Sequence, residues 1–213
     1  MAIEEFQRIG YTVKWKILNS AHYGVPQLRE RVFIIGFRSD LNCHNNFHFP
    51  LITHGERLKP FVPIGDVIFK HDDVDQKYYF SERAVRGAKR NSSKMKKAVY
   101  QDESKPCLTI TSHLAKVSLN SRDPVLLVDP VKEKYRRFTP LEAARIQSFP
   151  DDFNFVGSQS SAYRQIGNAV PPVVMWHLMN SIKNTLFGNV SKMNNVVPEN
   201  EPSIQLELPF PQS

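Results

Sequence analysis

The chain has 213 residues, of which 41% are hydrophobic and 23% charged, so it can bury the core of one large domain or two small ones. No apolar run reaches the roughly 18 residues of a membrane-spanning helix, and Met1–Phe6 lacks the basic flank and apolar core of a signal peptide, so a cytoplasmic protein is expected. The formal net charge of +7 favours a polyanionic partner, and two cysteines are too few for a disulfide scaffold or an all-cysteine metal site, so no metal is expected.

The first forty residues predict α/β structure. Ile3–Ile9 fits the end of a helix closed by Gly10, and Tyr11–Leu18 alternates apolar and polar residues as a strand does. Arg31–Phe37 is a continuous apolar run, which predicts a strand buried on both faces. One helix and two strands cannot close a parallel sheet alone. The segment therefore begins inside a domain or completes another one.

Residues 40–135 are rich in Asn, Pro and Lys, and Lys105–Ser112 and Val125–Asp129 are their clearest predicted strands. A stretch without acidic residues precedes these strands. Such a stretch is a solvated helix face or flexible loop, or else a surface that contacts nucleic-acid phosphates. Its basic residues are Arg83, Arg86, Lys89, Arg90, Lys94, Lys96 and Lys97.

Residues 136–188 predict helices. Thr139 to Glu142 forms a capping box with Pro140 at the first helical position. A second helix starts near Pro171–Pro172 and has an apolar stripe that predicts packing onto the α/β segment. The stripe consists of Met175, Leu178, Met179, Ile182 and Leu186. Residues 189–213 are rich in Asn, Ser, Pro and Glu and predict a disordered tail.

Three short blocks occur in an order that resembles the DNA cytosine-5 methyltransferase family. Residues 23–31 (YGVPQLRER) match the family's Gln-x-Arg-x-Arg, which enters a strand. Residues 137–150 (RFTPLEAARIQSFP) match Arg-x-Thr-x-x-Glu-x-x-Arg-x-Gln-x-Phe-Pro, the most specific of the three. Residues 163–172 (YRQIGNAVPP) are similar to the family's Gly-Asn-x-Val-x-Pro.

In a strand, Gln27, Arg29 and Arg31 would share one face and could grip a nucleotide and its phosphate. The resemblance implies that Arg29 and Arg31 reach a flipped cytosine and its flanking backbone, with Gln27 in support; an exposed charged strand end is the alternative. The resemblance also implies that Asn168 and Val170 border an S-adenosylmethionine pocket, whereas a plain helix–helix corner is equally compatible.

The second block is expected to organise the recognition region. Glu142 and Arg145 are three residues apart on a helix and can pair. Arg136 and Arg137 are candidates for phosphate contact, together with the basic residues Arg83, Arg86, Lys89 and Arg90. In the third block, Gly167 can end a helix and Asn168 can tolerate an unusual backbone conformation.

The resemblance implies an α/β fold: a partial doubly wound, S-adenosylmethionine-dependent methyltransferase-like domain, completed by its C-terminal helix, plus a smaller, mostly β or irregular target-recognition domain. The expected division has catalytic strands in 1–38, the recognition domain in 39–160, helices returning to the catalytic domain in 161–188 and the tail in 189–213. Double-stranded DNA would lie between the two domains, and in a bacterial cell the protein would be associated with the nucleoid.

Parts of the family pattern do not occur in these 213 residues. No G-x-G is present, although the family's methyl-donor site starts with a glycine-rich turn. The nucleophilic cysteine of the family lies in Pro-Cys-Gln, whereas Pro106-Cys107 is followed by Leu108 and comes after Gln27. The family's Glu-Asn-Val is absent, because Glu199-Asn200 is followed by Glu201. This chain is therefore predicted to be inactive alone.

Three interpretations follow. The first is a split enzyme, in which a second polypeptide carries the nucleophile and most of the S-adenosylmethionine site; Met1 falls near an element boundary, which favours it. The second is a degenerate, inactive methyltransferase, and the third is a stand-alone DNA-binding or regulatory module.

In the tail, Gln205–Phe210 resembles the Gln-Leu-x-Leu peptides that dock into bacterial sliding clamps, the alternative being an incidental apolar tail.

Overall fold

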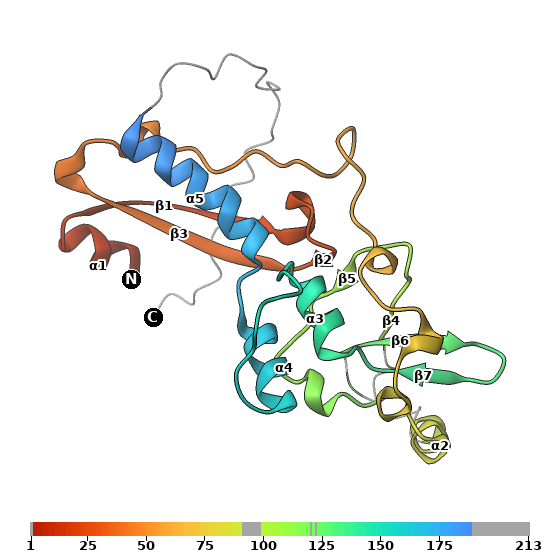
Figure 1. The fold of residues 1–213 in the computed structure, drawn as a ribbon. Coiled ribbons are helices and arrows are strands. Elements are labelled where there is room, and N and C mark those ends of the chain that lie inside the picture. Colours follow the sequence, from red (N-terminus) through yellow and green to blue (C-terminus); the bar gives the residue numbers. More distant parts are fainter. Residues whose placement is uncertain (1, 91–98, 120, 122, 189–213) are drawn as a thin grey trace.

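The computed structural model describes residues 2–90, 99–119, 121 and 123–188 (Figure 1). The helices are α1 (Ala2–Arg8), α2 (Glu82–Arg90), α3 (Pro140–Ile146), α4 (Gln159–Asn168) and α5 (Pro172–Phe187). The strands are β1 (Tyr11–Asn19), β2 (Gln27–Leu28), β3 (Glu30–Arg38), β4 (Val99–Tyr100), β5 (Cys107–Leu108), β6 (Pro124–Asp129) and β7 (Lys134–Arg136). Short 3-10 turns span Ser20–Tyr23, Ser39–Leu41, His44–Asn46, Ile64–Asp66, His71–Asp73, Gln76–Tyr78 and Leu114–Lys116.

The predicted tail and its Gln205–Phe210 peptide lie outside the described residues. No helix within the described ranges is long and apolar enough to cross a membrane. No group of three or more His, Cys, Asp or Glu that could hold a metal ion occurs in that part of the chain either.

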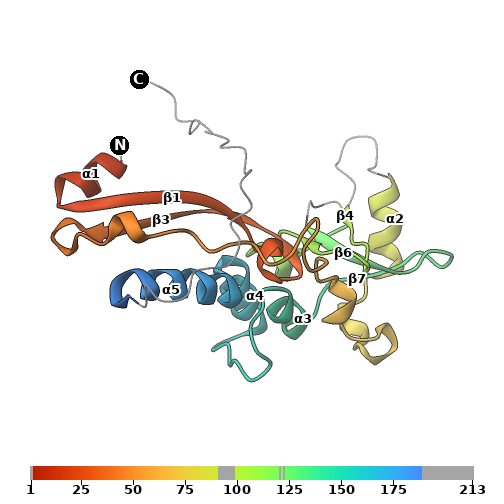
Figure 2. The ribbon, with the colours of Figure 1, turned by 90° about the horizontal axis from the view of Figure 1, so that it is seen from above.

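A long antiparallel hairpin forms the amino-terminal part of the structure. α1 ends before Gly10, whose positive φ of 88° turns the chain, and β1 then pairs with β3 from Tyr11↔Arg38 to Asn19↔Glu30. These elements confirm the predicted helix and both predicted strands. α5 lies along one side of the hairpin and α1 lies on the other (Figure 2).

Only one face of this hairpin is well covered. Leu18 and Phe37 are buried, and Phe33 and Ile35 pack with residues of α5. On the other face, Val32 is 49% and Ile34 is 45% exposed. The prediction that residues 31–37 are buried on both faces is therefore wrong. In the described structure β3 pairs with β1 alone, and α5 covers one side of the pair.

The remaining strands are short. β2 pairs with β5 in parallel, and β4, β6 and β7 form a three-stranded sheet. β6 confirms the strand predicted at Val125–Asp129, but only Cys107 and Leu108 of the predicted strand 105–112 are in a ladder. The ladder stops before Ile110 because side chains form hydrogen bonds with the backbone of that residue. Gln27 accepts from the Ile110 N–H, and Arg29 donates to the Ile110 carbonyl oxygen.

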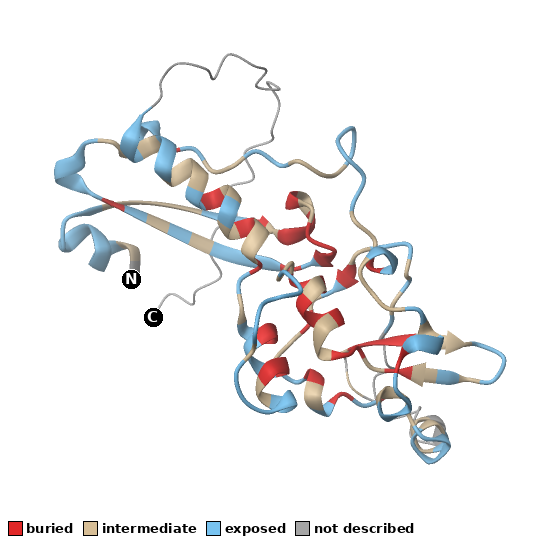
Figure 3. Ribbon diagram, in the orientation of Figure 1, coloured by how far each residue is buried: buried red, intermediate tan, exposed pale blue. Residues whose placement is uncertain are grey.

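The largest hydrophobic cluster joins α3 and α4 to β5 and β6, and Figure 3 shows the buried residues gathered there. Ile110, Leu126 and Ile146 are among its fully buried members. α3 begins with the predicted capping box, in which Thr139 accepts from the Glu142 N–H and Glu142 accepts from the Thr139 N–H. The boundary expected after residue 160 falls inside α4.

The helix predicted after Pro171 is α5, but its apolar stripe is only partly buried. Leu178 is buried, and Met175 and Ile182 pack beside it against the hairpin. Met179 and Leu186 are exposed, so they face away from that contact. The hairpin is too narrow to cover the whole stripe, because two strands cover only part of the circumference of a helix.

Candidate functional site

Arg29 joins three segments that are far apart in the sequence. Its guanidinium is buried, with 3% of the residue exposed. Nη1 donates to the carbonyl oxygen of Ile110 at 2.9 Å, and Nη2 donates to the carbonyl oxygens of Gly167 at 2.9 Å and Ala169 at 3.2 Å. The Gln-x-Arg-x-Arg segment and the Gly-Asn turn are therefore in direct contact.

Two buried glutamines extend this junction. The Gln27 amide donates to Oε1 of Gln147 at 3.0 Å, while its own oxygen accepts from the Ile110 N–H at 2.9 Å. Gln147 donates in turn to the carbonyl oxygen of Ile166 at 2.7 Å. Each amide thus satisfies backbone groups that burial would otherwise leave without a partner. We call Gln27, Arg29 and Gln147 the junction cluster.

The junction cluster contains a buried cation without a carboxylate partner. Burial lowers the pKa of Arg29 to about 10, and the nearby charge of Arg31 contributes in the same direction. Arg29 still carries its charge at neutral pH. Its charge is balanced by carbonyl dipoles, which hold the ends of α4 and of β5 at fixed positions around it.

Replacing Arg29 with lysine should destabilise the chain by about 2 kcal/mol, because one ammonium group cannot reach all three carbonyl oxygens. Urea-induced unfolding of the full chain measures the change. Arg31→Lys is the matched control: Arg31 is exposed, and its replacement should alter stability by less than about 0.5 kcal/mol. Equal stability of the two variants would show that the junction does not depend on the hydrogen bonds of the Arg29 guanidinium.

Three of the predicted site residues are exposed around the junction cluster. Arg31 is exposed and donates to the Glu30 carbonyl oxygen at 2.6 Å, whereas Gln27 and Arg29 are buried. The three side chains therefore do not present the one shared face that the strand pattern predicted. Asn168 and Val170 flank Ala169, one of the acceptors of Arg29. The exposed side chains of the two blocks are thus held by the same buried contacts.

Gly167 has a different role from the predicted one. It lies inside α4, which continues to Asn168, and Asn168 has no positive φ. A Cβ at Gly167 would lie 2.2 Å from the carbonyl carbon of Thr111 and 2.3 Å from the amide nitrogen of Ser112. The glycine is required because the backbone of residues 111–112 packs directly against the helix.

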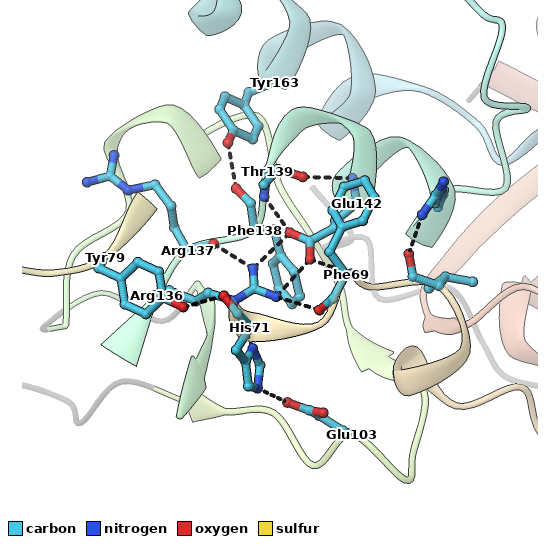
Figure 4. Close-up of polar contacts among 12 residues, drawn as sticks. Phe69, His71, Tyr79, Glu103, Arg136, Arg137, Phe138, Thr139, Glu142 and Tyr163 are labelled. Carbon is cyan, nitrogen blue, oxygen red and sulfur yellow. Dashed lines mark hydrogen bonds and ion pairs between the residues drawn. The ribbon is translucent and has the colours of Figure 1, made fainter. Parts of the chain in front are cut away.

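A second polar cluster is buried beside α3 (Figure 4). Arg136 is fully buried and pairs with Glu142, whose two carboxylate oxygens lie 2.8 and 2.9 Å from its Nη2 and Nη1. The prediction that Arg136 contacts DNA is therefore wrong, since the β6–β7 sheet turns it inward. The predicted Glu142–Arg145 pair is also wrong, because Arg145 pairs with Asp151 at 2.6 Å.

Arg137, next in the chain, points away from that cluster (Figure 4). It is partly buried and lies 5.5 Å from the centre of the Phe80 ring. Arg83 and Arg86 are exposed on α2, and Arg86 pairs with Glu82 at 3.6 Å. The side chains of Lys89 and Arg90, and all of Lys94, Lys96 and Lys97, lie outside the described part of the chain.

Cys107 is the cysteine in the Pro-Cys sequence. It is fully buried in β5, and burial raises the pKa of its thiol. A nucleophilic cysteine needs an accessible thiolate, so this environment is unsuited to attack on a base. Cys43 packs at the edge of the hydrophobic cluster beneath α5.

Sequence reasoning missed a group of polar residues around Arg137. α4 packs against the turn Leu114–Lys116, and this contact gathers Lys77, Lys116 and Gln159 near Arg137. No local pattern links these residues, because they lie in four separate segments. The capping residue Ser158 was the one signal in the sequence that marks the start of α4 at this place.

The fold of this chain is similar to that of solved methyltransferase structures. A methyltransferase of Entamoeba histolytica, EhMeth, superposes with a TM-score of 0.63 at 16% identity, covering 86% of this chain and 57% of that one. The Dnmt2 methyltransferase of S. pombe gives a TM-score of 0.63 at 17% identity, with 87% and 61% covered. The chain therefore has an α/β methyltransferase-like fold.

The sequence comparisons define the family. The model of the C-5 cytosine-specific DNA methylases matches residues 1–184. The type II methyltransferase M.AplI of Arthrospira platensis is 33% identical over 99% of this chain and 56% of its own length. M.BsuRI of Bacillus subtilis is 33% identical over 96% of this chain and 50% of its own length. The chain belongs to the C-5 cytosine-specific DNA methylase family, and it spans about half the length of these relatives.

Proposed function

We propose that this chain is the DNA-recognising portion of a cytosine-5 DNA methyltransferase of the type II restriction–modification class. It binds double-stranded DNA, reads the target sequence and helps hold the flipped cytosine, while a second polypeptide carries the nucleophile and most of the methyl-donor site. The observation that supports this most strongly is the Arg29 bridge. It fixes the exposed Arg31 relative to the exposed Asn168 and Val170, the residues that the family resemblance assigns to base and donor.

Arg31 is suited to hold an anionic or carbonyl group of a nucleotide. It is exposed, and in the described structure its one hydrogen bond is to the neighbouring Glu30 carbonyl oxygen, so further N–H donors can reach a ligand. A base that undergoes chemistry must leave the duplex. The resemblance implied that Arg29 reaches the flipped cytosine together with Arg31. In this proposal Arg29 and Gln27 act as positioning residues instead, because burial keeps both from a substrate.

Asn168 and Val170 fit one wall of an S-adenosylmethionine site. Their exposed side chains offer an amide and an apolar surface, and the junction cluster fixes the backbone between them. The bound donor would supply the methyl group. The rest of its site would come from residues outside this chain.

The basic residues of α2 are proposed to contact the DNA backbone. Arg83 and Arg86 are exposed on the helix, whose Val85 and Ala88 pack against the β-sheet region. Long cations on a fixed helix can neutralise phosphates and release counterions. This contact would position the duplex rather than read its sequence.

The face of the β1–β3 hairpin opposite α5, where α1 leaves Val32 and Ile34 exposed, is the proposed docking surface for the second polypeptide. Tyr11, Ile17, Val32 and Ile34 are exposed on it, and Trp15 is partly exposed. Contiguous exposed apolar surface of this kind is typical of an interface. The occupant we propose carries the portion of the relatives' length that this chain does not match, because helices cover both faces of the sheet in a doubly wound domain.

Ile34→Asp tests this surface. The change should leave the stability of the isolated chain within about 0.5 kcal/mol, because Ile34 is 45% exposed. It should weaken association with the second polypeptide at least about tenfold, because a carboxylate would be buried without a partner. Val131→Asp is the control, since Val131 is 90% exposed at a different place, the β6–β7 turn. Equal association of both variants would contradict the assignment of this face.

Transfer of labelled methyl groups from S-adenosylmethionine to duplex DNA tests the proposed function. The 213-residue chain alone should give no labelled DNA. Addition of the polypeptide that carries the G-x-G and Pro-Cys-Gln blocks should produce label at cytosine C5, and Arg31→Ala should reduce it strongly. Labelling by the isolated chain would contradict the proposal that a second polypeptide carries the nucleophile and most of the methyl-donor site.

A further inference from the structure

A cavity whose wall carries several cationic and polar side chains lies on the α4 side of the molecule, outside the junction cluster. Its volume is about 390 Å³, and its wall includes Lys77, Tyr78, Lys116, Arg137, Gln159 and Ser160. The residues come from the turn Gln76–Tyr78, the turn Leu114–Lys116, the end of the β-sheet and the start of α4. The Tyr78 hydroxyl accepts a hydrogen bond from the Gln159 amide at 2.6 Å, which joins two sides of the cavity.

The charge of this cavity is positive. Its described wall contains three cationic side chains and no carboxylate. Lys77 is partly neutralised by Asp75, whose Oδ2 lies 3.2 Å from Nζ. Most of the available charge therefore comes from Arg137 and Lys116, and Lys116 is exposed.

The guanidinium of Arg137 is incompletely satisfied by the protein. Its Nε is buried and has no hydrogen-bond partner, and its Nη1 lies 3.5 Å from the Ala115 carbonyl oxygen, a long contact. A buried N–H without a partner is costly unless a ligand or water satisfies it. Arg136 beside it has several partners, whereas the Nε of Arg29 in the junction cluster is also without one. Of these two incompletely satisfied arginines, Arg137 is the one that lines the cavity.

The amino terminus of α4 adds backbone N–H donors, whose partial charge is positive like that of the arginine and lysines. Ser158 caps the helix by accepting from the Ser161 N–H at 3.2 Å. The first N–H groups, those of Gln159 and Ser160, have no acceptor within a helix of this geometry. A helix start combined with an arginine and a lysine is a favourable place for a phosphate group.

We propose that this cavity binds a phosphodiester group of the DNA backbone, held by Arg137, Lys116 and the first amides of α4. The volume accommodates the phosphate with its attached sugar rather than the phosphate alone. The identity of the polymer as DNA rests on the proposed function. The anion site itself rests on the cavity, the unsatisfied guanidinium and the helix start.

The salt dependence of DNA binding tests the proposal. Binding of the full chain to a fluorescent duplex is measured by anisotropy at several salt concentrations. Loss of one phosphate contact should reduce the slope of log K against log salt by about 0.9, which corresponds to about eightfold weaker binding at about 0.1 M salt. Lys116→Gln and Arg137→Gln should each show this change, and thermal unfolding verifies that each variant is folded.

Lys132→Gln is the matched control, because Lys132 is an exposed lysine on the β6–β7 turn that does not line the cavity. It removes the same charge and should leave the slope within the scatter of the wild-type value. If the cavity variants and Lys132→Gln behave alike, the cavity does not hold the DNA backbone.

A second readout separates this proposal from the proposed function. Titration with inorganic phosphate should shift the amide NMR signals of Gln159 and Ser160, and Lys116→Gln should weaken the shift. A chain that binds phosphate here but does not bind any duplex would overturn the DNA assignment of the cavity and the proposed function together. Duplex binding by the wild type, with no phosphate shift and no effect of the cavity variants, would overturn the cavity proposal alone.

Discussion

Gly167→Ala should destabilise the chain by about 3 kcal/mol, the upper range for an added methyl group in a close-packed interior. The new Cβ would lie 2.2 to 2.3 Å from backbone atoms of Thr111 and Ser112. Backbone cannot rotate aside as the end of a long side chain can, so α4 and the 111–112 segment must separate. That movement would also strain the Arg29 hydrogen bond to the Gly167 carbonyl oxygen.

The matched control is Gly87→Ala. Gly87 lies within α2, where an added Cβ would meet no atom within 4 Å. Alanine is the better helix former, so this change should stabilise the chain by about 0.5 kcal/mol. Urea-induced unfolding measures both variants. Similar stabilities for the two alanine variants would mean that the close contact at Gly167 is not a constraint on the fold.

Glu142→Gln should destabilise the chain by about 3–5 kcal/mol, the usual result when one partner of a buried ion pair is removed. Glutamine has nearly the shape of glutamate and can still accept from the Thr139 N–H, so the capping box is retained. The loss combines two effects: Arg136 would remain fully buried beside a neutral amide, and the Phe69 N–H would face an NH2 group in place of its acceptor oxygen. Thermal or urea-induced unfolding at neutral pH measures the effect.

Asp151→Asn provides the comparison for the exposed ion pair. Asp151 pairs with Arg145 at 2.6 Å, but its side chain is 60% exposed. Water and salt screen such a pair, so its loss should change stability by less than about 1 kcal/mol. A loss from Glu142→Gln as small as that from Asp151→Asn would contradict the assignment of Arg136 and Glu142 as a buried structural pair.

Local patterns in the sequence predicted much of the fold. The turn at Gly10, the strand at Tyr11–Leu18 and the capping box at Thr139 depend on residues within a few positions of one another. Burial could not be predicted in the same way. The apolar run of β3 has the composition of a strand covered on both faces, but the described structure covers one face, and no pattern within the run distinguishes these cases.

The candidate site shows the same limit. Arg29 and Arg31 are two residues apart in one motif, and the motif identified both, but only the fold shows that one is buried at the junction and the other is exposed. Arg136 and Arg137 are adjacent, and the fold buries one against Glu142 and turns the other toward a cavity. Which arginine meets a ligand is decided by contacts between segments more than 60 residues apart, such as Arg136 with His71.

The cavity beside Arg137 could not have been found from the sequence. Lys77, Lys116 and Gln159 each lie in segments without a distinctive motif, and they converge because α4 packs on the Leu114–Lys116 turn. The exposed apolar face of the β1–β3 hairpin could not be predicted from the sequence either. Its residues alternate along two strands, and their exposure depends on which other elements pack on the hairpin.

Bisulfite sequencing of DNA from the host tests the central claim most directly. With the gene intact, cytosines within one short sequence should be methylated, and deletion of the gene should abolish that methylation. The wild-type gene should restore it and Arg31→Ala should not. Expression of these 213 residues alone in a host without cytosine methylation should leave the DNA unmodified. Unchanged methylation after deletion, or new methylation from this chain alone, would contradict the account.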